Sequence, residues 1–253
     1  NSITMTLFRA GVFLWSLIFA SEVYAQGPAR IAVAANFKAT LEVLIDALAQ
    51  SDPASQSNYQ LVSGSTGVLF AQISAGAPFD LFLAADSARP EALHNQNRFS
   101  RHLPKVYAQG RLALWIPNRD VPWAAVLATF EGNLALANPA LAPYGAAASA
   151  LLALPLFQRA PRRVQGNNVH QAYQFVETGN AQGALISLAQ LIQAKVPPDQ
   201  YYLPPQTHYP AITQKRILLS DHPAAHALDQ FLATSRAAAI IKQAGYHTAL
   251  VQE

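Results

Sequence analysis

The chain has 253 residues, of which 51% are hydrophobic and 12% charged, with no cysteine and one methionine. The length suits one large domain or two domains of about 110–130 residues each. The absence of cysteine excludes disulfide scaffolds, thiolate zinc sites, iron–sulfur clusters and cysteine nucleophiles. The formal net charge of +3 is only mildly basic and the longest basic run is Arg162–Arg163, which argues against a nucleic-acid-binding protein.

The first 25 residues have the pattern of a secretory signal peptide. Arg9 precedes an apolar run from Gly11 to Ala20, and Val23-Tyr24-Ala25 has the small or branched residues expected at a cleavage site. The apolar run is roughly half of the ~20 residues that a membrane-spanning helix needs, which favours a signal peptide over an anchor. Residues 1–4, ahead of Met5, are interpreted as an upstream leftover. We therefore expect cleavage after about Ala25 and export to the periplasm.

Apolar runs alternate with helical patterns along the rest of the chain. In chain order, the sequence predicts a strand at Ile31–Ala35, a helix at Phe37–Ala49, a strand at Tyr59–Ser63, a helix at Val68–Ser74, a strand at Phe79–Ala85, a helix at Arg89–Asn95, strands at Arg111–Ile116 and Leu134–Ala137, helices at Ala146–Leu154 and Val169–Glu177, strands at Ala184–Ser187 and Ile217–Ser220, and helices at Pro223–Ser235 and Ala237–Ala244. This alternation predicts an α/β fold with mostly parallel sheets.

The pattern also predicts two lobes. A boundary is expected near Lys105–Gly110, after the third strand–helix unit, and the chain is expected to return to the first half near Lys215, because the closing segments have no other sheet to join. The first lobe would comprise residues 26–107 plus 216–253, and the second lobe residues 108–215. Strands crossing between the lobes would leave a cleft between them.

Small, hydroxyl and amide residues stand at four of the strand-to-helix junctions. The junctions are Ala35-Asn36-Phe37, Ser63-Gly64-Ser65-Thr66-Gly67, Ala142-Pro143-Tyr144-Gly145 and Gly166-Asn167-Asn168-Val169. In open α/β sheets, ligands bind at the carboxyl ends of the strands, where helix starts expose unpaired N–H groups. Taken singly, Asn36, Ser65, Thr66 and Asn168 could be ordinary helix N-caps. Because none of the junctions carries a carboxylate, the four together predict an anion site.

An ordered set of motifs resembles the periplasmic molybdate-binding proteins of ABC transporters. The motifs are AANF at 34–37, SGSTG at 63–67, GAPFDLFLAAD at 76–86, NPALAPYG at 138–145, GNNVHQA at 166–172 and IIKQAGY at 240–246. The resemblance covers nearly all of residues 31–245. It implies a two-lobed periplasmic binding protein of the type II kind, in which each lobe is a mostly parallel sheet flanked by helices and the ligand cleft lies between the lobes.

The resemblance also implies which residues contact the ligand: Ala35, Asn36, Ser65, Thr66, Tyr144 and Val169. Asn36 would donate its backbone N–H and side-chain amide, and Val169 its backbone N–H. The hydroxyl position that is usually serine in the family aligns with Thr66, so which of Ser65 and Thr66 points inward stays open. Tyr144 would contact the anion from the second lobe.

The chemistry of these donors suits molybdate. At neutral pH molybdate is a fully deprotonated dianion that only accepts hydrogen bonds, whereas phosphate carries a proton and would leave a donor unsatisfied, at a cost of roughly 1–3 kcal/mol. Tungstate has the same charge and nearly the same size. With this chemistry, the resemblance implies molybdate or tungstate as ligand and the membrane permease of an ABC importer as partner. We further expect no cofactor, no metal coordinated directly by the protein, no nucleic acid, and a monomer.

Two alternatives stay open. One is a binding protein for another tetrahedral oxyanion such as sulfate, which must be rejected on size alone. The other is a hydrolase that uses Ser65 or the pair Asp80 and Asp86, although Ser65 lacks the spacing of a nucleophile elbow. Asp80 is interpreted as a structural cap or edge residue, and Asp86 as a helix N-cap or hinge residue.

The histidines are interpreted as structural. His222 and His226 lie four residues apart, but no glutamate stands between them as in the zinc-protease motif, so they are interpreted as an exposed structural pair. His170, beside the proposed contact Val169, is interpreted as an exposed helical residue.

Overall fold

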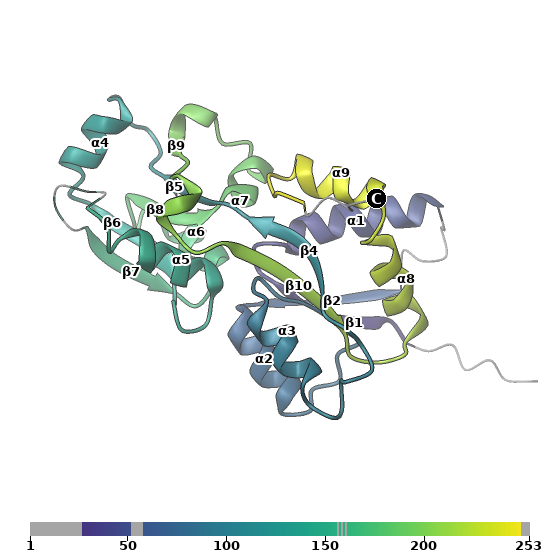
Figure 1. Cartoon of the computed structure of the whole chain (residues 1–253). Helices are drawn as coiled ribbons and strands as arrows, with labels where there is room; N and C mark the ends of the chain where they lie inside the picture. Colours follow the sequence, from purple (N-terminus) through teal and green to yellow (C-terminus); the bar gives the residue numbers. More distant parts are fainter. Residues whose placement is uncertain (1–26, 52–57, 156, 158, 160, 249–253) are drawn as a thin grey trace, which may run out of the picture.

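The structure is a computed structural model that describes residues 27–51, 58–155, 157, 159 and 161–248. Two five-stranded sheets, each flanked by helices, form two lobes (Figure 1). The predicted signal peptide lies outside the described residues. Among the helices that the structure describes, none has both the length and the apolar content that crossing a membrane requires.

The first sheet has the strand order β2-β1-β3-β10-β4. Its strands are β1 (Ala29–Ala34), β2 (Tyr59–Gly64), β3 (Leu81–Leu83), β4 (Lys105–Gly110) and β10 (Ile212–Leu218), and its helices are α1 (Lys38–Ser51), α2 (Thr66–Ser74), α3 (Ala88–His94), α8 (Pro223–Phe231) and α9 (Ser235–Gln243). Ile31 and Val33 pack with the helices α1, α8 and α9, while Ala32 packs with α2 and α3. This alternation buries both faces of the sheet.

The second sheet has the strand order β7-β6-β8-β5-β9. Its strands are β5 (Leu112–Trp115), β6 (Asn133–Ala137), β7 (Arg162–Gly166), β8 (Gly183–Ser187) and β9 (Tyr201–Tyr202), and its helices are α4 (Trp123–Thr129), α5 (Pro143–Leu151), α6 (Val169–Glu177) and α7 (Leu188–Gln193). Leu112 and Leu114 pack with α5, while Ala113 and Trp115 pack with α6 and α7. Both faces of this sheet are therefore also buried.

One strand in each sheet runs against the others. In the first sheet β10 is antiparallel to β3 and β4, and in the second sheet β5 is antiparallel to β8 and β9. The remaining pairings, β1 with β2 and β3 and β6 with β7 and β8, are parallel. The prediction of a two-lobed α/β fold with mostly parallel sheets is thus confirmed.

The chain crosses between the sheets twice. It leaves the first sheet at Gly110, enters the second at Leu112, and returns to the first at Ile212. Gly110 and Ile212 face each other in the pairing of β4 with β10, so both belong to the first sheet. The change of sheet therefore comes a few residues inside the expected second lobe of 108–215, at residue 111 and between 203 and 211.

Candidate functional site: a cavity between four helix starts

A small cavity lies where the two lobes meet. Its lining comes from four strand-to-helix junctions, with one further residue from the end of β3: Ala34, Ala35, Asn36, Gly64, Ser65, Thr66, Ala142, Pro143, Tyr144, Asn168, Val169 and Ala85. These are the four junctions that the sequence singled out, and the six residues expected to contact the ligand all line the cavity. The lining has no acidic or basic side chain.

Helix starts give this neutral cavity a positive potential. The helices α2, α5 and α6 begin at Thr66, Pro143 and Val169, and α1 begins at Lys38, just beyond Asn36. The N–H groups in the first turn of a helix lack intrahelical acceptors and carry the positive end of the helix dipole. Helix starts directed at one point therefore favour an anion without the help of a charged side chain.

The hydroxyl group of Ser65 is available to a ligand. Ser65 is the N-cap residue of α2, with extended backbone angles of φ −68° and ψ 145°, but its side chain makes no capping hydrogen bond. Its Oγ is buried and has no hydrogen-bond partner. Leaving such a group unsatisfied costs about 1–3 kcal/mol, which an acceptor on a bound ligand would recover.

The Thr66 side chain, in contrast, takes part in a hydrogen bond within the protein. Its Oγ1 accepts a hydrogen bond from the backbone N–H of Ala85 at 3.0 Å, which ties the start of α2 to the end of β3. Accepting this bond leaves the Thr66 hydroxyl its own proton, so either hydroxyl can donate to a ligand, and Ser65 Oγ is the one of the two that has no hydrogen-bond partner within the protein.

The side-chain amide of Asn36 donates its hydrogen bonds to other protein groups. Its Nδ2 donates to Gln214 Oε1 at 3.1 Å and to Tyr246 Oη at 3.2 Å, and Tyr246 Oη donates to the Asn36 carbonyl at 2.7 Å. The expectation that this amide donates to the ligand is wrong for this structure, because both acceptors belong to the protein. Asn36 can still offer its backbone N–H.

Tyr144 brings a hydroxyl group from the second lobe. Its Oη accepts from Ser187 Oγ at 3.1 Å and from Gln214 Nε2 at 3.4 Å. Burial raises the pKa of this phenol well above its ordinary value, so it stays protonated and keeps a proton to donate. Gly110 makes room for it, since a Cβ at that position would lie 2.2 Å from Tyr144 Oη.

Gln214 connects the two lobes at the back of the cavity. It is fully buried at a register shift in β10, and it bonds to Asn36 and Tyr107 of the first lobe and to Tyr144 of the second. Gln214, Ser187 and Tyr246 were not predicted from the sequence as site residues. Tyr246 closes the IIKQAGY motif, but no local pattern marks Gln214.

The lobes also touch at the mouth of the cavity. The Gly67 N–H donates to the Leu141 carbonyl at 2.8 Å, and Arg89 Nη2 donates to the Ala140 carbonyl at 3.1 Å. A Cβ on Gly67 would lie 3.0 Å from the Leu141 oxygen, so glycine allows this close approach. The structure therefore has its lobes closed over the cavity.

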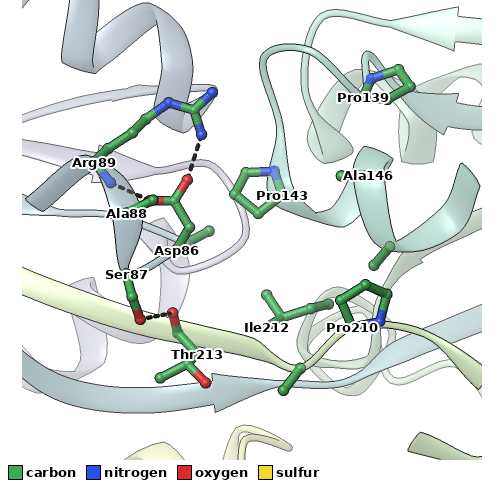
Figure 2. A pocket seen from close by; sticks show the side chains of 13 residues that line it. Asp86, Ser87, Ala88, Arg89, Pro139, Pro143, Ala146, Pro210, Ile212 and Thr213 are labelled. Atoms are coloured by element: carbon green, nitrogen blue, oxygen red, sulfur yellow. Dashed lines mark hydrogen bonds and ion pairs between the residues drawn. The ribbon is translucent and has the colours of Figure 1, made fainter. Parts of the chain in front are cut away.

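A second, larger cavity of about 410 Å³ adjoins the first and shares Ala85 and Pro143 with it. Figure 2 shows Pro143 facing the ion pair of Asp86 with Arg89, and Ser87 bonded to the Thr213 carbonyl on β10. Proline and alanine side chains form much of the remaining wall. Unlike the smaller cavity, this one has an aspartate and an arginine in its wall.

The aspartates considered for hydrolysis are structural, as interpreted from the sequence. Asp80 accepts from the Arg30 N–H at 2.7 Å and from Ser220 Oγ at 2.6 Å, whereas Asp86 accepts from the Arg89 N–H at 3.0 Å at the start of α3. They lie on either side of β3 and share no partner. His170 is exposed on α6, as expected, with its ring near that of Tyr173.

Comparison with known proteins agrees with this geometry. A family model described as "bacterial extracellular solute-binding protein" matches residues 29–247. The molybdate-binding protein ModA of Azotobacter vinelandii is 35% identical over 86% of this chain and 88% of its own length, and ModA of Rhodobacter capsulatus is 34% identical over 95% and 96%. The solved structure of the Azotobacter vinelandii periplasmic molybdate-binding protein superposes with a TM-score of 0.74, covering 86% of this chain and 98% of that one. The chain thus belongs to the ModA family of bacterial extracellular solute-binding proteins.

Proposed function

We propose that the protein captures molybdate, and tungstate equally, in the periplasm and delivers it to the membrane permease of an ABC importer. The observation that carries this proposal is the buried, unpartnered hydroxyl of Ser65 in a small cavity that is rich in donors and free of carboxylates. The ModA relatives, similar along nearly their whole length, support the same ligand.

The proposed contacts come from both lobes. Ser65 and Tyr144 would donate hydroxyl protons, while Asn36, Thr66 and Val169 would donate backbone N–H groups; Ala35 flanks the anion. An oxyanion without protons can accept from every one of these donors. Charge-assisted hydrogen bonds are roughly twice as strong as neutral ones, so several together bind an anion tightly without a salt bridge.

Other parts of the proposal follow from this mode of binding. The protein needs no cofactor and catalyses no reaction, because none of the cavity residues offers an activated nucleophile or a base. It acts as a monomer, after removal of a signal peptide that ends at about Ala25.

Binding can be tested by thermal unfolding and calorimetric competition on ligand-free protein. Molybdate and tungstate should raise the melting temperature, because a ligand that binds only the folded state stabilises it. Phosphate should have little effect. A shift with sulfate that equals the shift with molybdate would instead favour the alternative of a general oxyanion carrier, and no shift with molybdate at saturating concentration would refute the proposal.

A pair of substitutions tests whether the anion binds in this cavity. Ser65→Asp places a carboxylate in the cavity and should abolish binding, whereas Ser74→Asp makes the same change of charge at the exposed far end of α2 and should leave binding intact. Equal affinities in two folded variants would show that the anion binds elsewhere.

A further inference from the structure

Three side chains that can ligate a metal ion meet on the first lobe, and none of them lines the anion cavity. His102 precedes β4, Asp221 follows β10, and His226 lies on α8. The Nε2 atoms of His102 and His226 lie 3.5 Å and 3.7 Å from the same atom, Asp221 Oδ1. The three ligand atoms all lie within 4.8 Å of one another.

These distances fit a tetrahedral ion better than direct contacts between the residues. Zinc binds imidazole nitrogen and carboxylate oxygen at about 2.0–2.2 Å, which places neighbouring ligand atoms about 3.3–3.6 Å apart in a tetrahedron. The two distances to Asp221 Oδ1 exceed a hydrogen bond and match this edge to within a few tenths of an ångström. His102 Nε2 is buried and has no hydrogen-bond partner, so the protein leaves this ring nitrogen unoccupied.

The surrounding residues hold the ligands in place. Arg101 Nη2 donates to the other carboxylate oxygen of Asp221, Oδ2, at 2.8 Å, which leaves Oδ1 for the two histidines. The same arginine lowers the pKa of Asp221, so its carboxylate stays charged. His94 Nδ1 lies 3.0 Å from the carbonyl of His102 and fixes that loop. Hydrogen bonds of this outer kind orient metal ligands.

The cluster is accessible to an ion. The side chains of Asp221 and His226 are 62% and 38% exposed, and a hollow of about 340 Å³ that includes His102, His226 and Lys105 in its wall adjoins them. The ammonium group of Lys105 is paired with Asp229 at 2.7 Å and so does not compete for Asp221. Room remains for a water molecule as a fourth ligand.

We propose that His102, Asp221 and His226 form a site for a divalent transition-metal ion, zinc above all, with water in the fourth position. Two imidazoles and one carboxylate suit zinc, nickel or copper rather than the harder calcium and magnesium, which prefer oxygen ligands. The ion would link the loop before β4 to the start of α8. This proposal does not depend on the proposed function.

The site also separates two histidines that the sequence paired. His222 is the N-cap of α8, where its Nδ1 accepts from the Ala224 N–H at 3.2 Å, and its Nε2 lies 2.8 Å from the Gly27 carbonyl. His226, one turn along the helix, approaches His102 and Asp221 instead. His222 therefore has a structural role, whereas His226 belongs to the proposed metal site.

Titration calorimetry of the untagged protein, stripped with a chelator and free of molybdate, tests this site. Zinc chloride should bind with a stoichiometry of one, and cobalt chloride should give the intense visible absorption of tetrahedral cobalt. His226→Gln and Asp221→Asn, both at partly exposed positions, should each weaken zinc binding at least tenfold, as loss of even outer-shell partners weakens metal sites about 10–100-fold.

The matched control is His222→Gln, which removes a histidine from the same helix start and should leave zinc affinity unchanged. Thermal unfolding without metal checks that each variant is folded. Unchanged zinc affinity in both His226→Gln and Asp221→Asn, loss of affinity in His222→Gln alone, or no zinc binding by the parent protein would overturn the proposal.

Discussion

Two buried polar clusters in this molecule differ in how completely their polar groups are paired within the protein. Arg216 and Asp229 are 2% and 5% exposed, and they pair through Nε and Oδ1 at 2.7 Å, with Lys105 on Oδ2 at 2.7 Å. In the anion cavity, by contrast, the buried groups are neutral and Ser65 Oγ has no partner. In the first cluster each charged group has a partner within the protein, whereas the second keeps a donor free.

The difference explains what each cluster does. Arg216 also donates to the Asp229 carbonyl at 3.0 Å, so the ion pair joins β10 to α8 and stabilises the first lobe. An unmatched buried donor lowers stability in the free protein but gains energy when an acceptor arrives. A cluster whose polar groups are all paired thus stabilises the fold, while a cluster with an unpaired donor favours ligand binding. Substitutions in the first should lower the free energy of unfolding, and substitutions in the second should lower the affinity for the ligand.

The largest effect is expected for Asp229→Ala. It leaves Arg216 charged and buried without its partner, which should lower the free energy of unfolding by about 3–5 kcal/mol. Denaturant unfolding measures this change. Glu131→Ala, which breaks the exposed pair of Glu131 with Arg159, should cost no more than about 1 kcal/mol. Similar losses in the two variants would contradict the structural role of the buried pair.

Ser65→Ala should instead lower the affinity for molybdate without lowering the stability of the fold. Losing a hydrogen bond to a charged ligand costs about 1.5–3 kcal/mol, so molybdate affinity should fall roughly 10- to 150-fold. The free energy of unfolding without ligand should stay the same or rise, because the buried unpaired oxygen is gone. Calorimetry and denaturant unfolding on the same samples measure both quantities, with Ser74→Ala at the exposed end of α2 as control. A clear loss of stability would mean that the Ser65 hydroxyl has a partner within the protein.

Tyr144→Phe should have a mixed effect, because this hydroxyl is both bonded within the protein and directed at the cavity. Ser187 and Gln214 lose their shared acceptor, which should lower the free energy of unfolding by about 0.5–1.5 kcal/mol. Molybdate affinity should fall by a similar amount, or by up to about 3 kcal/mol if the hydroxyl donates to the anion. A change in stability with unchanged affinity would show that Tyr144 only supports the cavity wall.

The smallest effect is expected in the pH dependence of the free energy of unfolding. Burial alone would raise the pKa of Asp229, but Arg216 and Lys105 outweigh it and lower the pKa below its ordinary value. A lowered pKa means that the stabilising contribution is present above about pH 4 and is lost as the pH falls through the pKa of the folded state. The stability difference between the parent protein and Asp229→Asn should therefore shrink below about pH 4. A difference that stays constant down to pH 2 would contradict the lowered pKa.

Strongly periodic elements were predicted well, and weakly patterned ones were not. The helix expected at Val169–Glu177 has these same bounds, whereas β7, with the sequence RRVQG, and the short helices α4 and α7 were missed. β7 is an edge strand with exposed polar residues, so it lacks the apolar pattern of a buried strand. The helix α5 was expected to begin at Ala146, but it begins at Pro143, which is favoured in the first turn because it lacks an N–H.

By itself the sequence determined the alternation of strands and helices, the four junctions that surround the cavity and the absence of charged residues from them. These features are local, because they depend on residue spacing and on the residues that follow each strand. Only the tertiary structure decided that Ser65 Oγ has no partner while Thr66 Oγ1 accepts from Ala85, that Asn36 turns its amide to Gln214, and that His226 meets His102 and Asp221. Each of these depends on contacts between segments far apart in the chain, which the packing of two sheets sets and no local pattern records.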